Sequence, residues 1–391
     1  MLSPAARAAL QMIANERVLH DETLLDAIGR PVRLTKSSRP DVANLRALSE
    51  SVLALLPPDL AALFLPLSDH DAADDKVVHM SDSSPVLAAF LEYVGPAGET
   101  WVAAIVGATV PTGANEVHLP MPALDEVVNR LNWSSDSCAW SSNTVDDMTF
   151  LLRVSGSAAP LDSRLESWRH VVAHLIVDAL AAAENYYGDD AAAQPASNYL
   201  KLLTLAHGPE SSAFGTQELL TAAQSFRDSL ASDLAQVVDV QPTETGVLVT
   251  VPFRAGSTTY PLSVVFAPTA PCPENPQTAA GLAFMSRCYA LVPAESAMKW
   301  ARIFNGDDMT SDTDDRWDQT TPWLTGSWRS LEGPEPEKMV VYRGFVPNAL
   351  KAHVSLTDLI AGTVREVWVS CDKYRLRERF NETVGVDHGT I

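Results

Sequence analysis

The stretch Val247-Leu248-Val249-Thr250-Val251, followed five residues later by Gly256, decides the fold of this chain. An earlier stretch, Val86-Leu87-Ala88-Ala89-Phe90, has the same apolar character and is followed at the same spacing by Gly95. Each glycine lies in a turn between two apolar runs, which is the sequence signal of a β-hairpin. The sequence therefore predicts two similar hairpins in different parts of the chain.

The similarity between the two regions extends beyond the hairpins. Val77-Val78-His79-Met80 precedes the first hairpin, and Val237-Val238-Asp239-Val240 precedes the second. After the hairpins, residues 120–132 parallel residues 293–305, and both segments begin with proline and end with asparagine. Such a long-period similarity indicates one structural unit repeated in tandem.

We expect an α+β protein of two tandem domains, each an antiparallel sheet packed with helices, after a short helical N-terminal extension. A sheet that helices cover on one face leaves its other face or its edges free. The predicted segments are an extension at 1–56, a first domain at 57–187, a linker at 188–215, a second domain at 216–377 and a flexible tail at 378–391.

The second domain allows the elements to be placed, with boundaries loose by a few residues. Ser355-Leu356-Thr357-Asp358 is a variant of the capping box and marks the start of the last helix. Helices are predicted at about 216–237, 293–305 and 355–377, and strands near 246–253, 259–267, 282–291, 324–330 and 338–346.

Composition and charge exclude several classes of partner. Of 391 residues, 46% are hydrophobic, which is typical of a globular chain. The 49 acidic residues outnumber the 28 basic ones, and a net charge of −21 repels nucleic acid and anionic membrane surfaces. The four cysteines form no C-x-x-C pair, which favours a reduced, cytoplasmic location.

One helical column carries the residue types of a metal site. Glu166, His170, His174 and Asp178 follow each other at intervals of four, so their side chains share one face of a helix. Two imidazoles at this spacing can ligate one metal ion. The alternative is that these residues form the solvated polar face of an amphipathic helix.

Four tryptophans cluster along the second domain. Trp317 and Trp323 lie in a predicted loop and are candidates for partner binding, because tryptophan is enriched at the energetic centres of interfaces. Trp300 and Trp328 lie in predicted regular elements and are expected in the core. The aspartates of residues 305–318 lack the glycine and glutamate positions of a helix-loop-helix calcium site.

Three local features of the second domain resemble the YbjN family, whose fold is similar to that of type III secretion chaperones. They are the hairpin of residues 247–266, the segment 291–305, and the strand 340–346 followed by the helix 353–368. The resemblance covers about residues 216–377, with a weaker echo over 77–187. It implies no catalytic residues.

Type III secretion chaperones act as homodimers that hold an extended client segment on their sheets. For this chain the resemblance therefore implies an internal pseudo-dimer that is monomeric in solution. We expect a non-enzymatic protein-binding or chaperone-like module without a cofactor, because no familiar nucleophile, zinc or phosphate-binding motif occurs. The alternative is a metal-dependent enzyme that uses the His170/His174 column.

Overall fold

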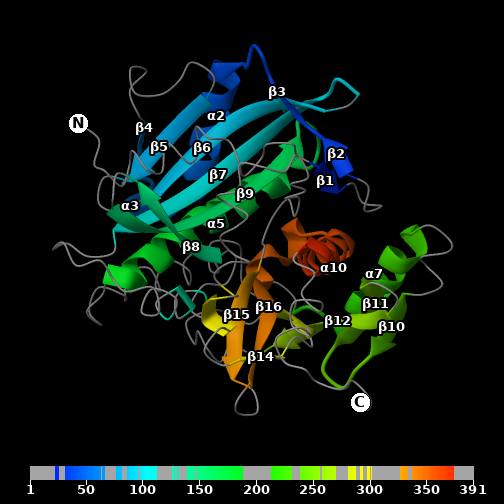
Figure 1. Cartoon of the computed structure of the whole chain (residues 1–391). Helices are drawn as coiled ribbons and strands as arrows, with labels where there is room; N and C mark the ends of the chain where they lie inside the picture. Colours follow the sequence, from blue (N-terminus) through cyan, green and yellow to red (C-terminus); the bar gives the residue numbers. More distant parts are fainter. Residues whose placement is uncertain are drawn as a thin grey trace.

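The structure is a computed structural model, and it consists of two antiparallel sheets packed with helices (Figure 1). This arrangement confirms the α+β prediction. The residues that the structure describes are 23–25, 31–62, 64–66, 76–81, 86–95, 97–111, 126, 128, 129, 132, 139–145, 148–187, 213–230, 238–255, 258–269, 281–287, 291–293, 297–299, 301, 326–332 and 337–373.

The first sheet has the strand order β4-β5-β6-β7-β9-β8, with β3 paired to β6. Its strands are β3 (Thr35–Lys36), β4 (Phe64–Pro66), β5 (Lys76–Ser81), β6 (Val86–Val94), β7 (Thr100–Pro111), β8 (Ala139–Val145) and β9 (Met148–Pro160). The helices of this half are α2 (Val42–Leu53), α3 (Pro58–Ala61) and α5 (Leu165–Tyr187).

The turn between β6 and β7 confirms the first predicted hairpin. The Gly95 amide donates to the Glu99 carbonyl, and the Gly98 amide donates to the Gly95 carbonyl. Gly98 has a φ of +82°, a left-handed conformation that glycine adopts without the steric cost of a Cβ atom. Glycine at this position therefore fixes the register in which Val94 pairs with Thr100.

Both faces of the first sheet are buried, which corrects the expectation of one free face. On β6, Val86, Ala88 and Phe90 join the main core under the helices. Alternate residues of the same strand, Leu87 and Leu91, join a second apolar cluster on the opposite face. The continuous apolar run of this strand is typical of a strand that is covered on both sides, so around β6 the described part of this sheet has no open face for a partner.

The N-terminal extension is only partly helical, contrary to prediction. Residues in β1 (Thr23–Leu25) and β2 (Pro31–Arg33) pair as a two-stranded sheet, and β3 joins the first sheet. Helix α2 begins where the Asp41 side chain accepts a hydrogen bond from the Asn44 amide. It contacts α5 and β5, so it serves as the opening helix of the first sheet.

The second sheet has the strand order β10-β11-β12-β13-β16-β14, with β15 paired to β16. Its strands are β10 (Asp239–Pro242), β11 (Val247–Ala255), β12 (Thr258–Thr269), β13 (Gly281–Arg287), β14 (Leu291–Pro293), β15 (Ser327–Glu332) and β16 (Glu337–Pro347). Its helices are α7 (Thr216–Ser229), the 3-10 helix η1 (Asn348–His353) and α10 (Leu356–Lys373).

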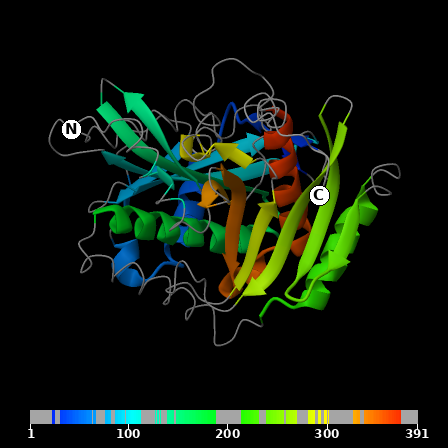
Figure 2. The ribbon, with the colours of Figure 1, turned by 60° about the horizontal axis from the view of Figure 1, so that its bottom comes forward.

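Helices α7 and α10 contact each other and strands β11 and β12. In Figure 2, α10 lies behind the strands of this sheet. The α10 cap is as predicted: the Asp358 amide donates to Ser355 Oγ at 3.3 Å. Helix α7 begins as predicted after Gly215, but its helical bounds end at Ser229, and the predicted extension lies mostly outside the described residues.

The two sheets match in their first half and differ in their second. Both contain a three-stranded antiparallel meander, β5-β6-β7 in one and β10-β11-β12 in the other. In the first sheet β7 pairs directly with β9, whereas in the second sheet β13 lies between β12 and β16. The predicted repeat thus extends to the meander and to the closing helices α5 and α10, but not to the strand order that follows the meander.

The two halves share one apolar core. Buried residues of both sheets and of α2, α5, α7 and α10 belong to a single cluster. Helix α5 contacts η1, strand β8 contacts β15, and the Ser330 amide donates to Asn129 Oδ1 at 2.9 Å across the junction. Among the helices described, none is long and apolar enough to cross a membrane.

Candidate functional site

The metal candidate on α5 lies at the junction of the two halves. Glu166 is exposed, whereas His174 and Asp178 are only 7% and 4% exposed. The interpretation of this column as a solvated polar face is therefore wrong for its C-terminal half. The cause is the position of α5, which contacts the first sheet on one side and η1 of the second half on another.

Glu166 and His170 are brought together by the helix spacing. Glu166 Oε1 lies 3.4 Å from His170 Nε2, and the other carboxylate oxygen forms an ion pair with Arg169. Burial lowers the pKa of His170, and the positive charge of Arg169 lowers it further. The imidazole is therefore mainly neutral at pH 7, so its contact with Glu166 is not a pairing of two full charges.

The partner of His170 is a histidine from the other half. The rings of His170 and His353 stack with centroids 3.9 Å apart and planes inclined by 12°. In such a stack the nitrogen lone pairs point along parallel planes and do not converge on one metal ion. Among the described residues, no group of three His, Cys, Asp or Glu side chains is arranged to hold a metal.

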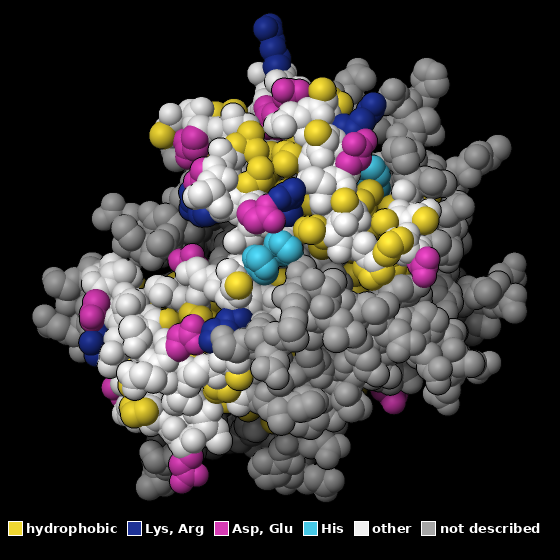
Figure 3. Space-filling model, turned by 180° about the vertical axis from the view of Figure 1, so that it is seen from behind, with side chains coloured by type: hydrophobic (Ala, Val, Ile, Leu, Met, Phe, Trp, Pro, Cys, Tyr) yellow, Lys and Arg dark blue, Asp and Glu magenta, His cyan; other side chains and the backbone are white. Residues whose placement is uncertain are grey.

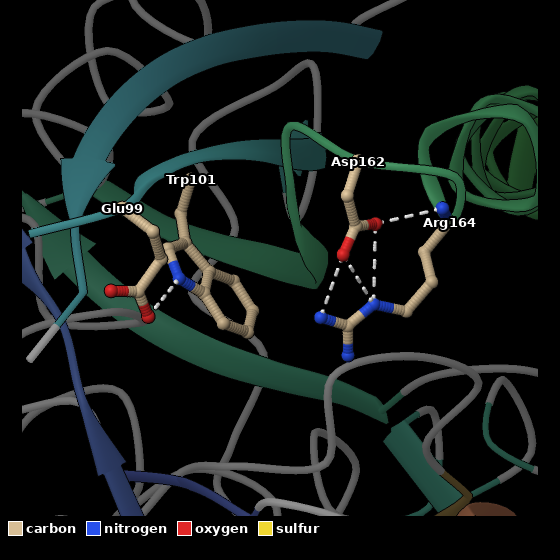
Figure 4. A network of polar contacts seen from close by, with 4 residues as sticks. All are labelled: Glu99, Trp101, Asp162 and Arg164. Atoms are coloured by element: carbon tan, nitrogen blue, oxygen red, sulfur yellow. Dashed lines mark hydrogen bonds and ion pairs between the residues drawn. The ribbon is translucent and has the colours of Figure 1, made fainter. Parts of the chain in front are cut away.

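A second polar cluster lies at one end of the first sheet (Figure 4). The Trp101 indole donates to Glu99 Oε1 at 3.1 Å, which lowers the pKa of Glu99. Arg164 donates through its guanidinium to both carboxylate oxygens of Asp162, and this interaction lowers the pKa of Asp162. Arg164 also lies 5.8 Å from the centre of the Trp101 ring, which is within the range of a cation–π contact.

This cluster reaches towards the second half through Asp358. Burial at the start of α10 raises the pKa of Asp358, whereas the hydrogen bond from Ser355 and the charge of Arg164 lower it. Arg164 belongs to the connection before α5, so its attraction to Asp358 acts between the two halves. The junction therefore contains two titratable contacts, the histidine stack and this longer-range pair.

Of the four tryptophans singled out in the second domain, one lies among the described residues. Trp317 and Trp323 lie outside the described residues, and so does Trp300. Trp328 is 2% exposed and packs edge-on against Tyr342 with ring centroids 5.5 Å apart, which confirms its prediction as a core residue.

The outer face of the second sheet is the face opposite α7 and α10, and it carries a row of half-buried side chains. The pairing register aligns Leu248 with Val265, Val265 with Met285, and Met285 with Arg343. All four side chains are of intermediate exposure. The alternate residues on these strands, such as Val249 and Val264, are fully buried under the helices.

The outer face has no polar residue in the centre of this row. On β11 and β12 its neighbouring positions are small or polar: Thr250 Oγ1 and Ser263 Oγ share a 3.0 Å hydrogen bond, and Ala267 pairs with Ala283 of β13. On β16, Val341 and Phe345 flank Arg343 on the same face and are buried. Leu248, Val265 and Met285 thus form an apolar strip across three strands with Arg343 at one end. Sequence reasoning predicted a free face in general terms, but the row requires the strand register, which periodicity does not supply.

His353 was missed as a site residue. It lies in η1, and no local sequence pattern indicates its contact with His170 on α5. Comparisons with known proteins add no information on the site: no protein-family model, curated protein or solved structure matches the chain. The resemblance to the YbjN family therefore remains a prediction.

Proposed function

We propose that this chain is a non-enzymatic, chaperone-like module that holds an apolar segment of a partner protein on the outer face of the second sheet. The observation that carries the proposal is the strip of Leu248, Val265 and Met285, which are apolar and only half-buried. Partner proteins bind preferentially where apolar side chains are contiguous and accessible.

The fold favours the second sheet over the first as the place where a partner binds. Around β6, both faces of the first sheet are occupied by apolar clusters, so a partner segment has no free face there. The β10 edge is also a poor template, because exposed Asp239 and Pro242 lie on it and proline offers no amide hydrogen. A partner is therefore expected on the face of the sheet rather than on this edge.

Charge favours a protein partner over other polymers. The net charge of −21 disfavours phosphate backbones, as the sequence indicates. Arg343 lies at the end of the apolar strip. The segment that fits the strip best is apolar. The resemblance to type III secretion chaperones supports the same class of partner.

The proposal is tested by affinity capture with matched variants. Val265→Asp places a charge in the middle of the strip, and Gln224→Asp places the same charge at an exposed position of α7. We expect the wild type and Gln224→Asp to capture similar amounts of a partner. Val265→Asp should capture at least tenfold less of it. Retention of the same partner by a folded Val265→Asp protein would contradict the proposal.

A further inference from the structure

The contact between His170 and His353 joins two halves of the chain that are separate in sequence. The rings come from α5 and from η1, and they lie face to face at 3.9 Å. In Figure 3 histidine side chains reach the surface at the level where the upper and lower halves of the molecule meet, beside acidic and basic groups. The His170 side chain is 13% exposed, so protons have access to it from solvent.

We propose that this histidine stack is a proton-sensitive contact between the two halves, which holds with at most one imidazole charged and opens when both are protonated. Two positive charges at this separation repel strongly in a partly buried site. Two neutral rings, or one neutral and one charged, carry no such repulsion. The contact therefore excludes one of the two protons that the separated histidines would bind.

The charged groups around the stack act in opposite directions. On α5, Glu166 favours a charged His170, whereas Arg169 disfavours it. On η1, Lys351 directs its charge to Glu218 on α7 at 2.6 Å. Burial and the charge of Arg169 hold the pKa of His170 below its ordinary value, in addition to any repulsion within the stack.

The other polar contacts across the junction respond differently to acid. The hydrogen bond between Ser330 and Asn129 contains no titratable group. Asp358 on α10 has a raised pKa, so its protonation stabilises the folded state as the pH falls, opposite in sign to the histidine pair. A response of the histidine stack is thus separable from that of Asp358 by an Asp358→Asn variant.

The test is amide hydrogen exchange of α5, η1 and α10 at pH 7.5 and 5.5, after correction for the intrinsic exchange rate. If the open state binds one proton more than the closed state, the equilibrium constant for opening rises about tenfold for each pH unit below the ordinary histidine pKa. We expect about a tenfold rise, confined to these elements, in a His79→Gln background, which removes the buried histidine of the first sheet. His170→Phe keeps an aromatic ring and should abolish the rise. His353→Phe also keeps a ring but leaves His170 buried beside Arg169, so it should reduce the rise without abolishing it.

The double variant makes the test specific to the pair. Because His170→Phe already removes the repulsion, His170→Phe/His353→Phe should lose no more of the pH response than His170→Phe alone. The proposal is overturned if both folded single variants keep the tenfold rise, or if exchange accelerates equally in the first sheet.

Proton titration followed by NMR in the wild-type chain gives a second measurement, which does not depend on the variants folding. The stack predicts two separate protonation steps for His170 and His353, with the second step at clearly lower pH. Independent titration of both rings near the ordinary histidine pKa would contradict the proposal.

Discussion

At the scale of single residues, buried polar groups determine how this protein responds to acid. His79 on β5 is 3% exposed and packs edge-on against Phe90. Its Nε2 lies 2.8 Å from Ser49 Oγ, which itself donates to the Arg46 carbonyl. The Ser49 hydroxyl oxygen therefore accepts a hydrogen bond from the Nε2–H group of His79. The neutral tautomer with its hydrogen on Nε2 satisfies this contact.

This environment predicts a loss of stability in mild acid. Burial lowers the pKa of His79, so the unfolded state binds more protons than the folded state below about pH 6.5. The free energy of unfolding should fall from pH 6.5 towards the folded-state pKa, at up to about 1.4 kcal/mol per pH unit. Urea titrations of wild type and His79→Gln at several pH values test this, and equal slopes would refute it.

Asn132 supplies a second prediction at this scale. Its side chain is 1% exposed and accepts from the Trp140 amide at 2.7 Å while donating to the Trp140 carbonyl at 3.2 Å. Asn132→Leu leaves both buried backbone groups unsatisfied and should destabilise the chain by about 2–4 kcal/mol. Thermal and urea unfolding measure the loss, with exposed Thr221→Ala as a control expected to change little.

At the scale of elements, the order of apolar and polar residues along a strand determines whether one or both faces of its sheet are buried. The run Leu87-Ala88-Ala89-Phe90-Leu91 on β6 contains no polar residue, and the structure buries all five side chains. By contrast, β11 contains Thr250 on the outer face between apolar residues that face the helices. The two hairpins appear alike in apolar content, but they differ in how strictly polar residues alternate.

Because β13, β15 and β16 pack closely, the stability of the protein should be sensitive to a larger side chain at this point. A Cβ atom added at Gly344 on β16 would overlap the Phe284 ring and would lie 3.0 Å from the Gly326 Cα. Gly344→Ala should therefore cost about 1–3 kcal/mol of stability through overpacking. Phe284→Leu should relieve part of this cost in the double variant, as a double-mutant cycle would show; strictly additive losses would contradict the packing argument.

At the scale of the whole molecule, local signals predicted the elements better than their assembly. The hairpins, β15, β16 and the start of α10 were predicted within a few residues, because apolar runs, turn glycines and the Ser355 cap are local features. The strands of the N-terminal extension were missed, because β1 and β2 are three residues long and show no alternation.

The candidate site was only partly predictable for the same reason. Four-residue spacing on α5 identified His170, but its stacking partner His353 lies 183 residues further on (residue 353 minus residue 170). Likewise, the apolar strip exists only because β11, β12 and β13 pair in one register. Such contacts between distant residues depend on tertiary packing and strand pairing rather than on local periodicity.

The shared core also bears on the oligomeric state. Residues of both halves pack into one apolar cluster, so the chain completes its own core. We expect a monomer with a mass near 42.2 kDa in size-exclusion chromatography with light scattering. A stable species of twice that mass would contradict the internal pseudo-dimer that the family resemblance implies.

The central claim, that the outer face of the second sheet holds a partner segment, is tested most directly by site-specific photo-crosslinking. A benzophenone amino acid replaces Met285 in the strip or Gln224 on α7, and the crosslinked peptides are identified by mass spectrometry. We expect position 285, and not position 224, to crosslink an apolar segment of a captured partner protein. Capture of that partner with equal crosslinking from both positions, or from position 224 alone, would contradict the claim.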